Sequence, residues 1–396
     1  METNKVIINI KNLILVNKKY FILFFIFVGY LILSLFLVYD IDNITYLHSD
    51  EQTFHDFALN VSKLDFKLWW AEIQNCYVGI FPTTNLYGTV FWYSLIYKLT
   101  NLIGLNSVIS LRLVNTVVGF FTTIIIVKYI QKSANVKLSF IEILCISMPF
   151  LFFSPTLLRD NYVILFIFSG LIVFREQKKN WILKLILFGV LTFMFRHVSL
   201  LYYILIIAIF LYLKYKNKFL IPIIVLSIII LLFVEIPLIS YAMNFRYNFL
   251  DRFANANLNT LLTLPFPINE LALLLYSFLG VFPFYAYIIL DLPKSLIRIP
   301  EMITSLVMFF YILRAYTFGI ILKVNLRYLT AITVLFLLAN IEFSLRRQMV
   351  VFPLLLELYY INKNLIKKTK NQNHKVISLF VIFLYLLLNL IYLVFI

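Results

Sequence analysis

Long apolar runs separated by short basic segments are the feature that most constrains this fold. The first run, residues 20–39, contains no charged residue, and similar runs recur along the whole sequence. Hydrophobic residues make up 63% of the chain and charged residues 13%, against about 25% charged in soluble domains. One soluble core of this size cannot bury so much apolar surface. The sequence therefore predicts an all-α, polytopic membrane protein and excludes a soluble enzyme or a nucleic-acid-binding module.

The basic residues predict the topology. The formal net charge is +16, and most Lys and Arg residues cluster between the runs, which is typical of cytoplasmic loops. Four lysines precede the first run, so we expect an uncleaved first helix with a cytoplasmic N-terminus. Further spans are predicted at residues 108–130, 138–155, 161–174, 181–195, 198–213, 219–239, 302–320, 328–341 and 349–361, with a final helix ending near Ile396. The total is about eleven spans, or up to thirteen if the ambiguous runs 86–103 and 271–290 also cross.

Two segments are expected outside the cytoplasm. Residues 40–72 hold seven of the 18 acidic residues, and the next predicted span ends in a basic cluster, so that span should run inward. Residues 40–107 then form one long external loop with surface helices, and residues 241–300 form a second, mixed external segment. The sequence thus predicts a helical module over residues 1–240 and a variable C-terminal membrane part over residues 241–396.

Several charged residues do not fit the positive-inside pattern, and such groups are functional candidates because charge at membrane depth is costly. They are Asp50-Glu51, Arg159-Asp160, Arg196-His197 and Arg346-Arg347, with Arg112 near the external start of its helix. Each has a structural alternative. The first pair suits a solvated loop or a helix N-cap, and the second a local ion pair. The third suits an arginine that snorkels to headgroups, and the fourth a pairing with Glu342.

These residue types suit complementary steps of one reaction. An external carboxylate can act as a general base toward a hydroxyl nucleophile or ligate a divalent cation. An arginine can hold a phosphate oxygen by charge-assisted hydrogen bonds, and Asp160 can orient such an arginine or help to bind a metal. As a set, the motifs predict a site for an acidic lipid headgroup beside a general base, with His55 as a second candidate base.

The order of these motifs resembles that of the GT-C glycosyltransferases, membrane enzymes that use polyprenyl-phosphate sugars. The resemblance covers roughly the first half of the chain. It comprises an Asp-Glu motif in the first external loop, an aromatic surface helix, an Arg-Leu-x-Asn helix, a Pro-containing hairpin that ends in a basic-acidic pair, and an exposed arginine. In this sequence these are Ser49-Asp50-Glu51, residues 86–99, Arg112-Leu-Val-Asn115 with Gly119, Pro149 through Arg159-Asp160, and Arg196. The Arg-Arg motif before Pro353 is also similar. The Lys-Pro-Pro motif of protein mannosyltransferases is replaced here by Phe81-Pro82-Thr.

The resemblance implies an inverting sugar transfer on the external face of a multi-pass membrane protein. The high Ile, Asn and Lys content favours a bacterial source, so we expect the protein in the inner membrane. Asp50 is the implied catalytic carboxylate, with Glu51 beside it and Asp160 facing the same cavity. The implied ligands of the donor phosphate are Arg112, Arg159, Arg196, His197, Arg346 and Arg347. Mg²⁺ or Mn²⁺ is a candidate cofactor, with Glu51 and Asp160 as its ligands, and no organic cofactor is expected. The partners are a polyprenyl-phosphate sugar donor, a glycan, lipid or protein acceptor, and membrane lipids.

Two other functions fit parts of the sequence. An oligosaccharide polymerase of the O-antigen type also uses external arginines, for which Arg196, Arg246, Arg252, Arg346 and Arg347 are available. A lipid-linked glycan transporter would need polar residues deep in the spans. Glu142, Glu235 and Glu357 lie in or near apolar runs and are the main support for that function.

Overall fold

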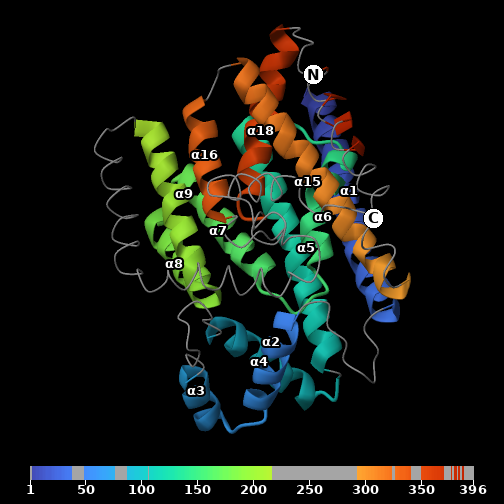
Figure 1. The fold of residues 1–396 in the computed structure, drawn as a ribbon, viewed down its shortest axis with the longest axis vertical. Helices are drawn as coiled ribbons and strands as arrows, with labels where there is room; N and C mark the ends of the chain where they lie inside the picture. The colour runs from blue at the N-terminus through green and yellow to red at the C-terminus, as the bar shows by residue number, and fades with distance from the viewer. Residues whose placement is uncertain are drawn as a thin grey trace. The chain divides into compact units, whose positions relative to one another are not determined.

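The computed structural model describes residues 2–37, 49–75, 87–105, 107–215, 292–322, 326–339 and 349–369, with short pieces between 376 and 387. Twelve helices run through these residues, and no strand occurs among them. The all-α prediction is therefore confirmed for the described part of the chain (Figure 1). The chain divides into two compact units. The first comprises Met1–Leu201 and Tyr287–Thr304, and the second comprises Tyr202–Ala286 and Ser305–Ile396.

The helices follow the predicted apolar runs closely. Those that begin in the first unit are α1 (Glu2–Leu37), α2 (Ser49–Ser62), α3 (Phe66–Asn75), α4 (Tyr87–Leu102), α5 (Ser107–Ala134), α6 (Phe140–Phe152), α7 (Asp160–Glu176), α8 (Trp181–Phe195), α9 (His197–Tyr215) and α15 (Leu292–Leu322). The last two continue into the second unit, which also contains α16 (Leu326–Ala339) and α18 (Phe352–Thr369). The predicted runs 219–239 and 271–290, the boundary at residue 240 and most of the final helix lie outside the described residues.

Two helices begin well before the predicted spans. The first span was placed from residue 20, but α1 begins at Glu2, and the span expected from residue 302 begins at Leu292. Charged residues mark the edge of an apolar run, but they do not stop a helix, because lysine is a good helix former. The Pro293 ring is tolerated near the start of α15, where its missing N–H has no helical partner to lose.

The α6 helix shows how local sequence sets a boundary. The Ser139 hydroxyl accepts a hydrogen bond from the Glu142 N–H, and the Glu142 carboxylate accepts one from the Ser139 N–H at 2.9 Å. This reciprocal capping box satisfies two N–H groups that the first turn leaves unpaired. Glu142, one of the residues that suggested a transporter, therefore has a structural role at the start of a helix.

The α5 helix is central to the first unit, where it packs against α1, α4, α6 and α7. Two glycines permit close helix approaches. A Cβ atom on Gly88 of α4 would lie 2.4 Å from the Met194 carbonyl oxygen of α8. A Cβ atom on Gly119 of α5 would lie 2.8 Å from the Ser154 Cβ and 3.1 Å from the Phe150 oxygen. Real side chains do not approach backbone so closely, so these positions need glycine.

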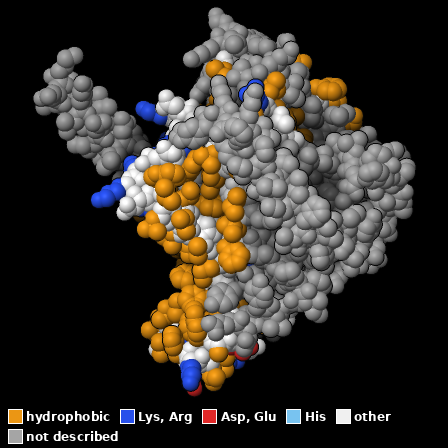
Figure 2. All heavy atoms as spheres, turned by 90° about the vertical axis from the view of Figure 1, so that its left-hand side faces the viewer, with side chains coloured by type: hydrophobic (Ala, Val, Ile, Leu, Met, Phe, Trp, Pro, Cys, Tyr) orange, Lys and Arg blue, Asp and Glu red, His pale blue; other side chains and the backbone are white. Residues whose placement is uncertain are grey.

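Apolar side chains cover the outer faces of two helices in this unit. On α8 the exposed apolar residues are Ile182, Leu183, Ile186, Leu187, Val190 and Phe193. Figure 2 shows such side chains gathered on the described part of the face that it views. The outer face of α1 exposes Phe21, Phe25, Ile32, Leu33 and Phe36. Among the residues described, Lys18–Phe36 and Val108–Ala134 are long and apolar enough to cross a membrane.

The second unit is held by aromatic and polar contacts between its helices. The Tyr328 hydroxyl of α16 donates a hydrogen bond to the Glu357 carboxylate of α18 at 2.7 Å. The Phe318 ring of α15 stacks on Tyr359 of α18, with centroids 5.5 Å apart. The buried Glu357 carboxylate therefore has a partner within its own unit.

The packing at Gly119 generates a stability prediction. The Gly119→Ala variant should lower the free energy of unfolding by about 1–3 kcal/mol, because the added methyl group meets the fixed atoms of Ser154 and Phe150. The apparent melting temperature in detergent measures this loss. Gly29→Ala is the matched control, since no atom lies within 4 Å of its added Cβ. Equal melting temperatures for the two variants would contradict the packing described here.

Candidate functional site

The turn between α6 and α7 is buried although it has no regular structure. Residues 153–159 all lie in the interior, where every backbone polar group needs a partner. Side chains from two other helices supply three of these partners. The Glu51 carboxylate of α2 accepts the Leu157 N–H at 3.0 Å, Arg112 of α5 donates to the Pro155 oxygen at 2.7 Å, and Asn115 donates to the Thr156 oxygen at 2.7 Å.

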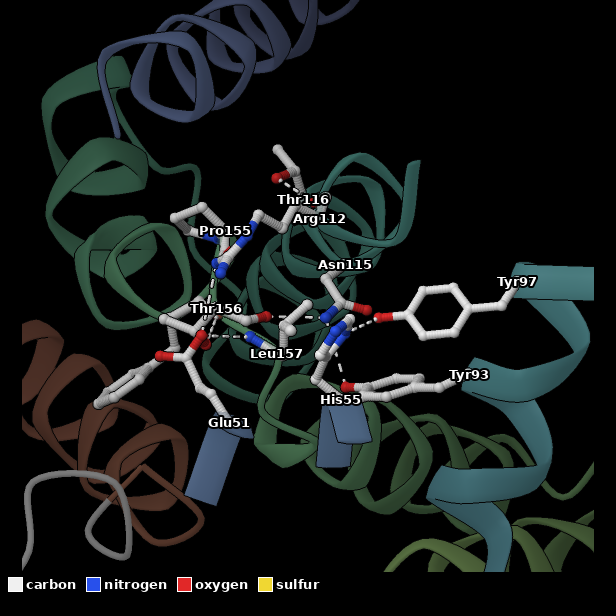
Figure 3. Close-up of polar contacts among 11 residues, drawn as sticks. Glu51, His55, Tyr93, Tyr97, Arg112, Asn115, Thr116, Pro155, Thr156 and Leu157 are labelled. Carbon is white, nitrogen blue, oxygen red and sulfur yellow. Dashed lines mark hydrogen bonds and ion pairs between the residues drawn. The ribbon is translucent and has the colours of Figure 1, made fainter. Parts of the chain in front are cut away.

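Glu51 and Arg112 also bind each other. Their nearest atoms are 3.4 Å apart, and the side chains are 0% and 1% exposed. Figure 3 shows Glu51 reaching from α2 toward Arg112 and the turn, with Asn115 beside them. Arg112 and Asn115 are three residues apart, so the same face of α5 presents both to the turn. One ion pair thus joins α2, α5 and the α6–α7 turn.

The basic-acidic pair at the end of this turn contacts α8. The Asp160 carboxylate lies 3.3 Å from Arg196, which ends α8. Arg159 donates a hydrogen bond to the Phe195 oxygen at 2.8 Å, and its guanidinium lies 5.2 Å from the centre of the Phe54 ring of α2. The turn is therefore fixed to α8 by two arginine contacts and to α2 by an aromatic one.

A second group of polar side chains continues from the turn into α4. Tyr162 donates to the Asn115 oxygen at 2.7 Å, and Trp92 donates to the Tyr162 hydroxyl at 3.0 Å. The His55 ring nitrogen Nδ1 and the Tyr97 hydroxyl are 2.8 Å apart. Sequence reasoning gave these aromatic residues no role. Asn115 also donates a hydrogen bond to the Tyr93 hydroxyl, at 3.3 Å. Tyr93 and Tyr97 are four residues apart, and this spacing, which puts both on one face of α4, was the available sequence signal for Tyr97.

The structure brings together five of the residues predicted from sequence: Glu51, Arg112, Arg159, Asp160 and Arg196. They come from separate motifs, and all are buried within the first unit. Asp50 lies in the first turn of α2 and His197 begins α9, but their side chains are outside the described part of the structure. Arg346 and Arg347 also lie outside it. The catalytic and ligand roles of all these residues stay predictions.

The described cluster holds one more positive than negative group. It contains three guanidinium groups and two carboxylates, which leaves one net positive charge, 3 − 2 = +1. Both carboxylates already contact arginines, and the described residues include no group of three His, Cys, Asp or Glu side chains that could hold a metal ion. The prediction that Glu51 and Asp160 ligate a divalent cation stays untested. The three arginines bind protein groups in this structure, and their role toward a donor phosphate stays a prediction.

Comparisons of the chain with protein-family models, with curated proteins and with solved structures find no match.

The buried ion pair generates a stability prediction. Arg112→Met should lower the free energy of unfolding by about 3–5 kcal/mol, because it leaves the buried Glu51 carboxylate without its counter-charge. Adding Glu51→Gln should restore part of that loss, and melting temperatures in detergent would measure both effects. A double variant whose loss equals the sum of the two single losses would contradict the coupling. Lys132→Met is the control: this lysine pairs with Glu176 at the surface, where loss of an ion pair costs under about 1 kcal/mol.

His55 generates a pH prediction. Burial lowers the pKa of its imidazole below the ordinary 6.5, the Asp56 carboxylate raises it in part, and Arg112 lowers it further. The unfolded chain therefore takes up this proton at higher pH than the folded protein. We expect the free energy of unfolding to fall as the pH drops below about 6.5. The contribution of the neutral, buried His55 is fully lost below its folded-state pKa. Melting temperatures between pH 8 and pH 5 measure this slope, which should be shallower in His55→Gln. If the slope is the same in His55→Gln as in the wild type, the pH dependence of the melting temperature comes from other titratable groups.

Proposed function

We propose that this chain is a polytopic membrane glycosyltransferase of the GT-C type. It transfers a sugar from a polyprenyl-phosphate-linked donor to a glycan, lipid or protein acceptor of the cell envelope. The protein lies in the bacterial inner membrane with a cytoplasmic N-terminus, and the reaction takes place on the external face.

Two observations support the membrane location. The described residues include two helices long enough to span a bilayer, and several shorter apolar helices accompany them. In addition, α1 and α8 expose rows of apolar side chains, which would be costly in water but are expected where a helix faces lipid.

The contact between Glu51 and the α6–α7 turn carries the proposal. Glu51 holds the first turn of α2 against the segment that ends in Arg159-Asp160. Asp50 is adjacent to Glu51 in the chain, and Arg196 contacts Asp160. The acidic motif and the basic residues, which are more than 100 residues apart in sequence, therefore meet in one unit. A transferase needs this combination, since a base must lie near the groups that hold the donor phosphate.

The reaction proceeds by direct displacement. Asp50 takes the proton of the acceptor hydroxyl, and the acceptor oxygen forms a bond to the anomeric carbon of the sugar. The bond from that carbon to the phosphate oxygen breaks, and the polyprenyl phosphate leaves with the electron pair. Arginines of the cluster stabilise the negative charge that develops on it. Glu51 and Asp160 position α2 and Arg196, respectively. A divalent cation bound together with the donor phosphate stays a prediction.

The Asp50→Asn variant tests the proposed base. We expect transfer activity to fall about 10²- to 10⁴-fold while the protein accumulates and folds normally, because the proposed reaction assigns the acceptor proton to the Asp50 carboxylate. The mass profile of surface glycans, compared among the wild type, a deletion strain and the deletion strain carrying Asp50→Asn, provides the readout. Loss of one sugar unit in both mutants is the expected result.

Asp56→Asn is the matched control, because Asp56 lies on the same helix with an exposed side chain. It should restore the wild-type profile. If the Asp50→Asn strain makes wild-type glycans, Asp50 is not the catalytic base. A polymer ladder that collapses to single repeats in the deletion strain would instead indicate a polymerase. Repeat units stranded on the lipid carrier inside the cell would indicate a transporter.

A further inference from the structure

Basic side chains from several segments meet at one end of the first unit. The Lys19 ammonium of α1 donates a hydrogen bond to the Leu138 oxygen, between the end of α5 and the start of α6, at 3.3 Å. Lys132, in the last turn of α5, pairs with Glu176, the last residue of α7. Lys178 pairs with the same carboxylate at 3.0 Å. The ends of α5 and α7, the start of α6 and the Lys19 turn of α1 are therefore neighbours.

The start of α8 lies at the same end. Residues 177–180 are the whole link between α7 and α8. The ring of Trp181, the first residue of α8, contacts that of Phe174 in the last turn of α7, with centroids 6.0 Å apart. The exposed apolar face of α8 therefore begins beside the group formed by Lys132, Glu176 and Lys178.

Few acidic groups balance the lysines at this end. The exposed lysines of these segments are Lys18, Lys128, Lys132, Lys137, Lys178, Lys179 and Lys184. The acidic side chains beside them are Glu142, which belongs to the capping box of α6, and Glu176, which already pairs with Lys132 and Lys178. Within the described residues, no carboxylate pairs with the other five lysines. This end of the unit thus presents a surface with a large excess of positive charge.

Two of the exposed lysines border the apolar faces of α1 and α8. Lys18 lies three residues before Phe21 and seven before Phe25, so these side chains share one exposed face of α1. Lys184 is the one charged residue of α8, and it lies three residues before the exposed Leu187. Each row of exposed apolar side chains therefore has an exposed lysine near the same end of the unit.

This continuity favours lipid over a water-soluble partner. A lysine beside apolar side chains that face acyl chains can extend its stem along them and place its ammonium among the headgroups. The half-exposed Trp181 ring lies at the same level of α8, and tryptophan is enriched at the membrane–water interface. Lys184 in particular needs such a position, because a charge on a lipid-facing helix is costly away from the headgroups.

We infer that this surface binds the phosphate groups of anionic phospholipids in the cytoplasmic leaflet. Groups of about four to eight basic residues directly beside membrane helices recruit anionic lipids. The attraction is the summed field of the lysines and needs no single pocket. The surface lies at the other end of α7 from the ion pair of Asp160 and Arg196, about 24 Å away for 16 residues at 1.5 Å per residue. The inference rests on the proposed membrane location and topology but not on the proposed sugar transfer.

Native mass spectrometry of the full-length protein in detergent tests the surface. The probes are phosphatidylglycerol, which is anionic, and phosphatidylcholine, which is zwitterionic, titrated separately. In the double variant Lys18→Gln/Lys184→Gln we expect the affinity for phosphatidylglycerol to fall about 5- to 25-fold, because each lysine near an anionic surface contributes a factor of about 5. The affinity for phosphatidylcholine should not change. Both lysines are exposed, so the variant should fold normally.

Lys63→Gln/Lys67→Gln is the matched control. Both of these lysines are exposed near the start of α3, so this variant loses the same charge from a segment that the topology places on the external side. It should bind phosphatidylglycerol like the wild type. Equal losses in the two double variants would assign binding to overall charge and overturn the inference.

Two further results would also overturn the inference. One is equal affinity of the wild type for the two lipids. The other is wild-type affinity for phosphatidylglycerol in Lys18→Gln/Lys184→Gln, which is expected if the surface binds a protein instead. Transferase activity enters none of these measurements, so this inference and the proposed function fail separately.

Discussion

The contact of Glu51 with Arg112 and with the Leu157 N–H determines how the first unit is built. A carboxylate and a guanidinium are each costly to bury, and a turn without regular structure cannot enter a core with unpaired backbone groups. Here the same contacts reduce the cost of burying the carboxylate, the guanidinium and the backbone of the turn. The ion pair neutralises both charges, and the same side chains supply the partners that the turn lacks. The α2 helix, the α5 helix and the α6–α7 turn are therefore positioned as one group.

The buried charged residues at the end of the α6–α7 turn hold helices together, and some of them are also the residues proposed to bind the donor. Asp160 and Arg196 form an ion pair, and Arg159 bonds the end of α8, so the residues that would bind a donor phosphate are already held by protein contacts. Such preorganisation lowers the cost of binding and of charge stabilisation, because little reorientation is needed when the ligand arrives.

The buried Arg112 of the first unit and the half-buried Arg314 of the second have different surroundings. Arg112 has a carboxylate and a carbonyl oxygen as partners, whereas Arg314 lies between aromatic rings, with its Nε unpaired within the described residues. Aromatic faces reduce the cost of a cation but do not use its N–H donors. Sequence reasoning overlooked Arg314, although a lone arginine in an apolar run was the available signal.

The sequence by itself determined the all-α class and most of the helices that the structure describes. The apolar run 181–195 coincides with α8, and those at 161–174 and 328–341 match α7 and α16 to within two residues, because the runs are long and continuous. It also identified Glu51, Arg112, Arg159, Asp160 and Arg196 as unusual. Only the tertiary structure decided which of them meet. Glu51 and Arg112 are 61 residues apart, and Glu51 and Leu157 are 106 apart. Local sequence patterns cannot predict such pairs, because side-chain periodicity specifies a face of a helix but not the element that packs against it.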